Sequence, residues 1–227
     1  MKPTIEAVTF DVDGTLYSIR RMVIRHFLTM LPVADFFKDL HKVRDEMRGL
    51  GPFDDFRQEQ ARRLAQRRNL SQEQAFNQVI AVIDKRWMRV FKKVRLFRGV
   101  RSVLTELGRR KIKLGLISDY PLKEKIRGMR LEDIVFETSV VSEQAGALKP
   151  HPASFILAAE QLKLKPERIL HVGDREDCDI EGAKAAGMIA ALFVQGKTPP
   201  QTKADFVFSN WKQFIPILEE RKMILKS

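Results

Sequence analysis

The sequence of 227 residues has little cysteine and no long apolar run. Its single cysteine, Cys178, cannot form a disulfide within the chain, so nothing indicates an oxidising compartment. The longest apolar runs, such as residues 188–194, are far shorter than the roughly 20 residues of a transmembrane helix. The first residues also lack the apolar segment of a signal peptide. We therefore expect a soluble, cytoplasmic protein that does not enter a membrane.

Acidic side chains are in the minority. The chain has 41 Lys and Arg against 29 Asp and Glu, a net charge of +12. Residues 17–95 hold 18 of the basic and 9 of the acidic side chains, so most of the excess lies in about one third of the chain. Such a surface attracts phosphorylated metabolites or nucleic acid. The simpler interpretation is a solvated helical surface, and because no nucleic-acid-binding motif accompanies it, we do not expect a nucleic-acid partner.

Apolar residues are plentiful, at 44% of the chain, which is enough for a folded core. Residues 5–10 have the pattern of a buried strand. Between residues 18 and 93 the apolar spacing is helical, and Ser71 with Gln74 predicts a capping box at one helix start. From residue 96 onward, expected helices alternate with expected strands at 112–117, 134–141, 169–172, 188–194 and 206–208.

This alternation determines the expected fold class. Strands that alternate with helices form a parallel sheet covered on both faces. We therefore expect an α/β protein, a doubly wound, Rossmann-like core with an inserted helical cap domain. The core is expected at residues 1–16 and 96–227, and the cap at residues 17–95.

Polar side chains follow four of the expected strands or the loops after them. They are Asp11-Val12-Asp13-Gly14-Thr15, Ser118-Asp119, Lys149-Pro150, and Gly173-Asp174 with Asp177 and Asp179 behind it. Ligands of open parallel sheets bind at this edge, and clustered carboxylates are unfavourable there without a bound ion. Asp11 and Asp174 offer the hard oxygen ligands that Mg²⁺ prefers. Ser118 and Lys149 suit a phosphoryl group, because its transfer needs mainly positioning and charge neutralisation.

In this order, the four motifs resemble those of the haloacid dehalogenase-like (HAD) superfamily, and the resemblance covers nearly the whole chain. The segments 147–152 and 171–174 look like those of its phosphatase-type members. A helical insert between the first and second motifs is similar to the C1 cap arrangement of that family.

The resemblance implies a Mg²⁺-dependent phosphomonoester hydrolase and assigns roles to its residues. Asp11 would be the nucleophile that forms an aspartyl-phosphate. Asp13 would protonate the leaving group and then activate water. Asp11, the backbone carbonyl of Asp13, and Asp174 would hold Mg²⁺, and Ser118 and Lys149 would bind the phosphoryl oxygens.

Three further residues complete the predicted site. Asp179 would orient Lys149 or a metal-bound water. Thr15 and Asp119 are grouped with the phosphate-binding residues, Thr15 because it would support the Asp11 carboxylate. At Asp119, family members often carry Asn, so the sequence departs from the family pattern there.

Alternatives remain at the level of substrate and reaction. The presence of Asp13 favours phosphoester chemistry, because the true dehalogenases of the superfamily lack an aspartate at this position and need no metal. We expect a small phosphorylated metabolite as the substrate, either a sugar phosphate or a nucleotide. The alternatives are a phosphomutase on the same core and a basic nucleic-acid-binding protein with little catalysis. The sequence is compatible with a monomer and with a dimer.

Overall fold

The computed structural model describes residues 5–196 and 201–225. Its core is a six-stranded sheet in the order β3-β2-β1-β4-β5-β6, and all neighbouring strands are parallel. The strands are β1 (Ala7–Phe10), β2 (Lys113–Ser118), β3 (Thr138–Val141), β4 (Ile169–Gly173), β5 (Ile189–Phe193) and β6 (Phe206–Phe208). The predicted α/β, Rossmann-like core is therefore confirmed.

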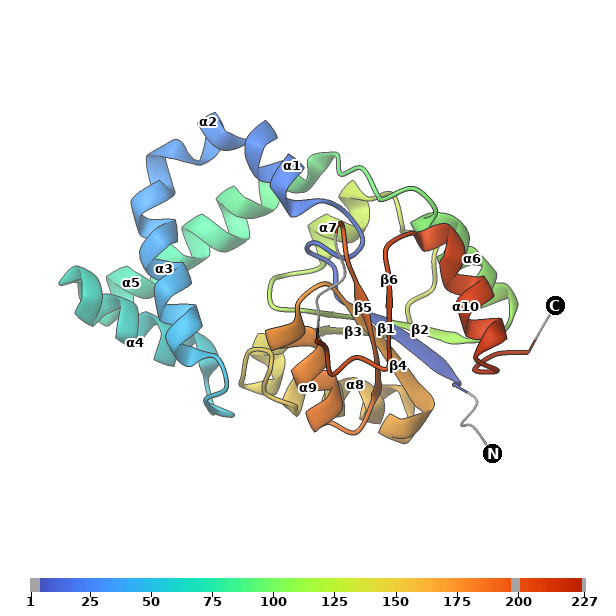
Figure 1. Cartoon of the computed structure of the whole chain (residues 1–227). Coiled ribbons are helices and arrows are strands. Elements are labelled where there is room, and N and C mark those ends of the chain that lie inside the picture. The colour runs from blue at the N-terminus through green and yellow to red at the C-terminus, as the bar shows by residue number, and fades with distance from the viewer. Residues whose placement is uncertain (1–4, 197–200, 226–227) are drawn as a thin grey trace.

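Helices cover both faces of the sheet (Figure 1). The helices α6 (Val100–Arg109) and α10 (Phe214–Glu220) lie on one face, and α8 (Ala153–Leu162) and α9 (Glu181–Ala185) lie on the other. Successive side chains of a strand point to opposite faces. In β1, Val8 accordingly packs in the apolar cluster of α6 and α10, whereas Ala7 packs in that of α8. Because β1 is buried on both faces, the residue that follows it is held rigidly.

The strand order reverses between β1 and β4, which is where ligands bind in sheets of this kind. The register pairs Phe10 with Val172, so the two strands end level with each other. The backbone N–H of Asp11 donates to the carbonyl of Val172 at 2.9 Å. The residues that follow β1 and β4 therefore lie side by side.

The helical insert lies between β1 and β2 in the chain and beside the sheet in space (Figure 1). It contains α1 (Ile19–Arg25), α2 (Phe27–Met30), α3 (Ala34–Met47), α4 (Phe56–Arg68), α5 (Gln72–Val79) and the π-helical segment Ile80–Trp87. The expected capping box is present: the Ser71 hydroxyl accepts from the Gln74 N–H at 3.1 Å, and the Gln74 side chain accepts from the Ser71 N–H at 2.9 Å. An apolar cluster built mainly from α3, α4 and α5 holds the insert together. The division into a core and a cap at residues 17 and 95 stays a prediction.

Two elements differ from the sequence pattern. The strand expected from residue 134 begins only at Thr138, because its pairing with β2 starts there. Ile134 and Phe136 still pack against the core from an irregular segment, which explains their apolar pattern. The helix expected from Ile180 is preceded by a π-helical turn, Glu176–Ile180, and continues as α9. Within residues 5–196 and 201–225, no helix is both long and apolar enough to cross a bilayer.

Candidate active site

Asp11 is the first residue after β1, and its carboxylate is buried among donors. The Lys149 ammonium donates to Oδ1 of Asp11 at 2.7 Å, and the Thr15 hydroxyl donates to Oδ2 at 2.9 Å. The loop can turn back because Gly14 has a φ of 103°, and a Cβ there would lie only 2.2 Å from a carboxylate oxygen of Asp174. This loop therefore needs glycine for both its conformation and the close approach of Asp174.

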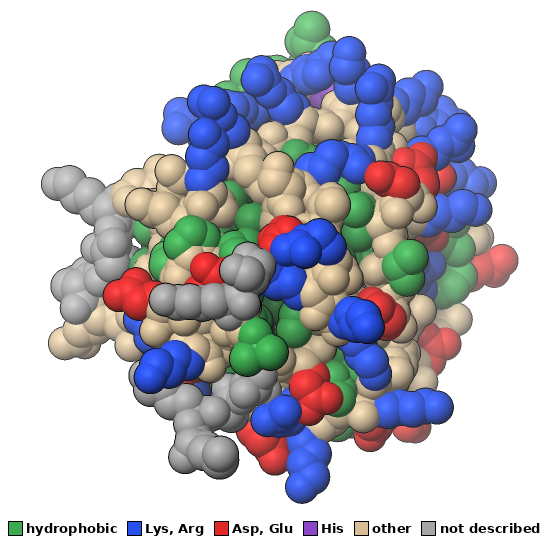
Figure 2. Space-filling view, turned by 90° about the vertical axis from the view of Figure 1, so that its right-hand side faces the viewer, with side chains coloured by type: hydrophobic (Ala, Val, Ile, Leu, Met, Phe, Trp, Pro, Cys, Tyr) green, Lys and Arg blue, Asp and Glu red, His purple; other side chains and the backbone are tan. Residues whose placement is uncertain are grey.

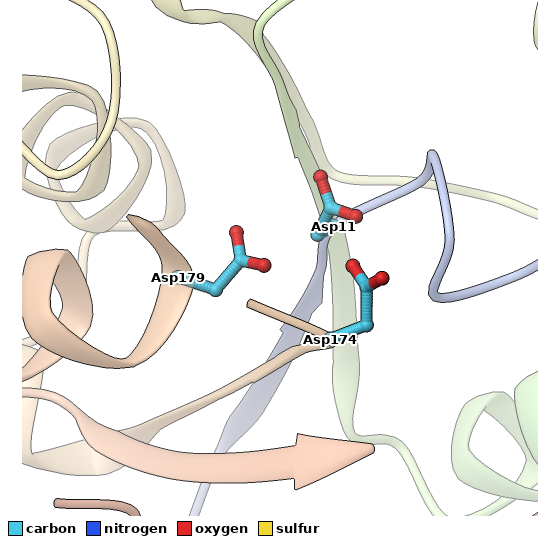
Figure 3. Close-up of side chains that lie close together, drawn as sticks. All are labelled: Asp11, Asp174 and Asp179. Carbon is cyan, nitrogen blue, oxygen red and sulfur yellow. The ribbon is translucent and has the colours of Figure 1, made fainter. Parts of the chain in front are cut away.

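Three carboxylates meet at this edge of the sheet. Asp11, Asp174 and Asp179 each place one oxygen within 4.8 Å of the others. Figure 3 shows the carboxylates of Asp11 and Asp174 beside each other, with Asp179 reaching toward them from the segment before α9. The Thr15 hydroxyl also lies 3.2 Å from Oδ1 of Asp174. A single hydroxyl thus positions two of the three acids.

Burial opposes ionisation of two of these acids, Asp11 and Asp174, even though Lys149 is nearby. Burial raises the pKa of Asp11 to about 7, although Lys149 opposes the rise, and Asp179 adds to it. Burial also raises the pKa of Asp174 to about 8, and Asp11 and Asp179 add to that rise. Oxygen ligands with an excess of negative charge are what Mg²⁺ requires. The residues present therefore fit this ion.

Lys149 connects two of the acids. Its ammonium donates to Asp179 at 2.6 Å as well as to Asp11, and only 4% of its side chain is exposed. Although burial works against it, these two carboxylates hold the pKa of Lys149 well above its usual range. Asp179 is held in turn by the backbone N–H of Arg175 at 3.1 Å. The contact expected between Asp179 and Lys149 is thus present in the structure.

Asp13 lies in a second group of residues, of which the sequence analysis identified Asp13 and Ser118 but not Lys125. Its carboxylate accepts hydrogen bonds from the Lys125 ammonium and the Tyr17 hydroxyl. The Lys125 ammonium also donates to the Ser118 hydroxyl at 3.2 Å, and its side chain is fully buried. Helical spacing could have identified Lys125 as a buried residue. It lies three residues after Leu122 and four before Met129, on the buried face of α7 (Lys123–Gly128).

Asp119 joins the sheet edge to the helical insert. Its carboxylate accepts from the Arg48 guanidinium at 2.6 Å and from the backbone N–H of Lys149 at 3.3 Å. Arg48 directly follows α3 and also donates to the Lys149 carbonyl at 2.9 Å. Arg44, on α3, donates to the Asp119 carbonyl at 2.5 Å. Although burial works against it, these cations and Lys149 lower the pKa of Asp119.

A small cavity of about 90 Å³ lies between these groups. It is lined by Asp11, Asp13, Arg48, Asp119, Tyr120, Lys149, Asp174, Arg175, Cys178 and Asp179. Ser118 and Thr15 do not line this cavity. The Ser118 hydroxyl accepts from Lys125 at 3.2 Å, and the Thr15 hydroxyl donates to Asp11 at 2.9 Å. Asp177 forms an exposed pair with Arg175 instead. The cavity has the size and polarity for a phosphoryl group and little more.

Lys125→Met should lower kcat by about 10²-fold, because Asp13 loses the cation that holds it, and general acid catalysis is worth at least that much. The loss should be larger for esters of aliphatic alcohols than for esters of acidic phenols, whose leaving groups need no proton. Steady-state phosphate release from both kinds of ester measures the difference. Lys123→Met, at an exposed position of the same helix, is the matched control. Equal losses with both kinds of ester would contradict a role for Lys125 at Asp13.

The chain is similar to known proteins in sequence and in fold. A sequence model of the haloacid dehalogenase-like hydrolase family matches residues 5–187, which include every residue of the site. A glyceraldehyde 3-phosphate phosphatase of Methanopyrus kandleri is 32% identical over 209 residues, or 85% of each chain. Pyrophosphatase PpaX of Bacillus mycoides is 25% identical over 229 residues, 94% of this chain and 97% of that one. A 2-haloacid dehalogenase structure from Pseudomonas syringae has the same fold, with a TM-score of 0.68 and 23% identity over 96% of this chain and 100% of that one.

Proposed function

Because this chain belongs to the haloacid dehalogenase-like hydrolases and its relatives are phosphatases, we propose that it hydrolyses a phosphomonoester through an aspartyl-phosphate on Asp11, with Mg²⁺ bound beside it. The observation that carries the proposal is the pairing of Asp11 with Lys149 at 2.7 Å, next to Asp174 and Asp179. The residues proposed as nucleophile, as cation for the phosphoryl group and as metal ligands all line one small cavity, which supports the proposal.

In the first step, an Asp11 oxygen attacks phosphorus, and the bond from phosphorus to the ester oxygen breaks. Asp13 donates a proton to that oxygen, so the substrate leaves as an alcohol. In the second step, Asp13 takes a proton from water, and the resulting hydroxide displaces Asp11 from phosphorus. Inorganic phosphate is released, and both aspartates return to their initial states.

Asp11, the backbone carbonyl of Asp13, and Asp174 are the groups that would hold Mg²⁺. When bound, this ion would neutralise negative charge on the phosphoryl oxygens. Lys149 would bind a phosphoryl oxygen, and Asp179 accepts a hydrogen bond from its ammonium and so positions it. Ser118 would donate its hydroxyl to a phosphoryl oxygen, and Lys125 holds that hydroxyl near the site.

The helical insert would act as the cap of this site. Arg48 spans the two parts of the molecule through its bonds to Asp119 and to the Lys149 carbonyl. Such a cap excludes water from the aspartyl-phosphate until the alcohol has left. Asp119 would then act by positioning Arg48 and Lys149 rather than by touching phosphate itself.

The two alternative functions receive less support. Figure 2 shows Lys and Arg side chains gathered along the upper edge of one face. Within the insert, however, many basic side chains are paired with acids. These pairs include Arg57 with Asp84 and Glu143, Arg62 and Arg63 with Glu59, Arg67 with Glu46, and Arg68 with Asp39. The charge pairs of α4 favour a solvated surface for that helix over a nucleic-acid interface. In the part of the chain that the structure describes, no contact specifically favours a phosphomutase.

Phosphate release from a panel of phosphomonoesters tests the proposal. We expect turnover with Mg²⁺, and none after chelation by EDTA. Acid quenching during turnover should trap a chain that is heavier by one phosphoryl group, with the modification on the peptide that contains Asp11. Release of phosphate without any trapped or exchangeable phosphoryl-enzyme would contradict the covalent step. Isomerised product without net phosphate release would instead establish a phosphomutase.

A further inference from the structure

A second, larger cavity of about 400 Å³ lies between the helical insert and the sheet edge. Its walls are mostly apolar. Ile19 and Val23 from α1, Phe27 from α2 and Phe37 from α3 contribute to them, together with Trp87. The rings of Phe37 and Trp87 pack with their centroids 5.0 Å apart, so one side of the cavity is aromatic.

This cavity adjoins the candidate active site. Asp13 and Tyr120 line both cavities. In the proposed reaction, Asp13 protonates the oxygen of the leaving alcohol, so the carbon attached to that oxygen lies on the Asp13 side of phosphorus. The rest of the alcohol then enters the larger cavity, because the small one has room for little beyond the phosphoryl group.

The walls determine which alcohol fits. A polyhydroxy group would lose its hydrogen bonds to water here and find mainly carbon atoms in their place. An apolar group gains by leaving water in proportion to its buried area. A cavity of roughly 150 Å³ binds benzene, so this one has room for an aromatic ring or a chain of several carbons. Glyceraldehyde 3-phosphate and pyrophosphate, which the relatives' names mention, carry no such group.

We propose that the substrate is a phosphate monoester of an apolar alcohol or phenol, with its apolar part between α1, α2 and the aromatic wall. This inference rests on the proposed function of the adjacent site. Val23 and Phe27 are 45% and 58% exposed, so substitutions there change the cavity without opening the core.

The test compares n-alkyl phosphates from methyl to octyl at fixed Mg²⁺. In the wild type, kcat/KM should rise about fourfold per methylene until the cavity is full, mainly through a lower KM. Val23→Asp should reduce the ratio of kcat/KM for octyl to that for methyl phosphate at least tenfold. Ile24→Asp is the matched control, because Ile24 is 65% exposed on the same helix and does not line the cavity, so its ratio should equal that of the wild type.

The possible outcomes are distinct. Phosphate release with no dependence on chain length overturns the inference and leaves the proposed function intact. No release from any ester, including those of the wider panel, contradicts the proposed function itself. A third outcome is that sedimentation shows Val23→Asp converting a dimer into a monomer while the octyl-to-methyl ratio of kcat/KM stays that of the wild type. The apolar surface is then an interface between two copies, and the inference is wrong.

Discussion

Asp11→Asn should lower Mg²⁺-dependent phosphate release by at least about 10³-fold, because an amide oxygen does not replace the carboxylate as a nucleophile. The folded state should persist. Asparagine has nearly the same shape, and the substitution removes one of three neighbouring carboxyl groups while Lys149 keeps its bond to Asp179. Phosphate release at saturating substrate gives the activity, and circular dichroism with thermal unfolding reports the fold.

Asp177→Asn is the control for this substitution. Asp177 follows Asp174 by three residues, but it is exposed, pairs with Arg175 and does not line the small cavity. Its loss should change kcat/KM less than twofold, because exposed ion pairs contribute little. An Asp11→Asn protein that keeps more than a tenth of the wild-type rate, or an equal loss in both variants, would rule out Asp11 as the nucleophile.

Lys149→Met should produce the largest loss of stability that we expect for any single change in the site. Three carboxylates would remain within 4.8 Å of one another, and Asp11 and Asp179 would both lose the ammonium that bonds to them. Removing one partner of a buried ion pair costs about 3–5 kcal/mol. Urea unfolding in EDTA measures this free energy. Phosphate release should fall in parallel, because the phosphoryl group loses its cation.

Mg²⁺ gives this prediction a second, independent readout. A ligand that binds only the folded state stabilises it, by about 2.7 kcal/mol at one hundred times its dissociation constant. Mg²⁺ should therefore stabilise Lys149→Met measurably, since the ion supplies charge to the same acids. Lys184→Met is the control, because Lys184 forms a half-exposed pair with Asp205 and its loss should cost at most about 1 kcal/mol. Equal unfolding free energies for the two variants would contradict the view of Lys149 as the cation of the acidic cluster.

Much of the site was predictable from the sequence for a simple geometric reason. The carboxyl ends of parallel strands meet at one edge of a sheet, so polar residues after β1, β2 and β4 must lie near one another. Asp11, Asp174 and Asp179 accordingly gather there, with Lys149 between two of them. Alternation of strands and helices likewise determined the parallel sheet, because the pattern is local and repeats along the chain.

The tertiary structure alone decided how the helical insert meets this edge. Arg48 reaches Asp119 across 71 positions of sequence, and Lys125 is brought to Asp13 from 112 positions away. Arg48 looks like an ordinary surface residue in the sequence, whereas the spacing of Lys125 from Leu122 and Met129 places it on an apolar helix face. Neither pattern shows which group the cation will meet, because local periodicity carries no information about distant segments. The apolar cavity has the same origin. Its walls come from α1, α2, α3 and Trp87, and only the packing of these segments beside the sheet brings them next to Asp13.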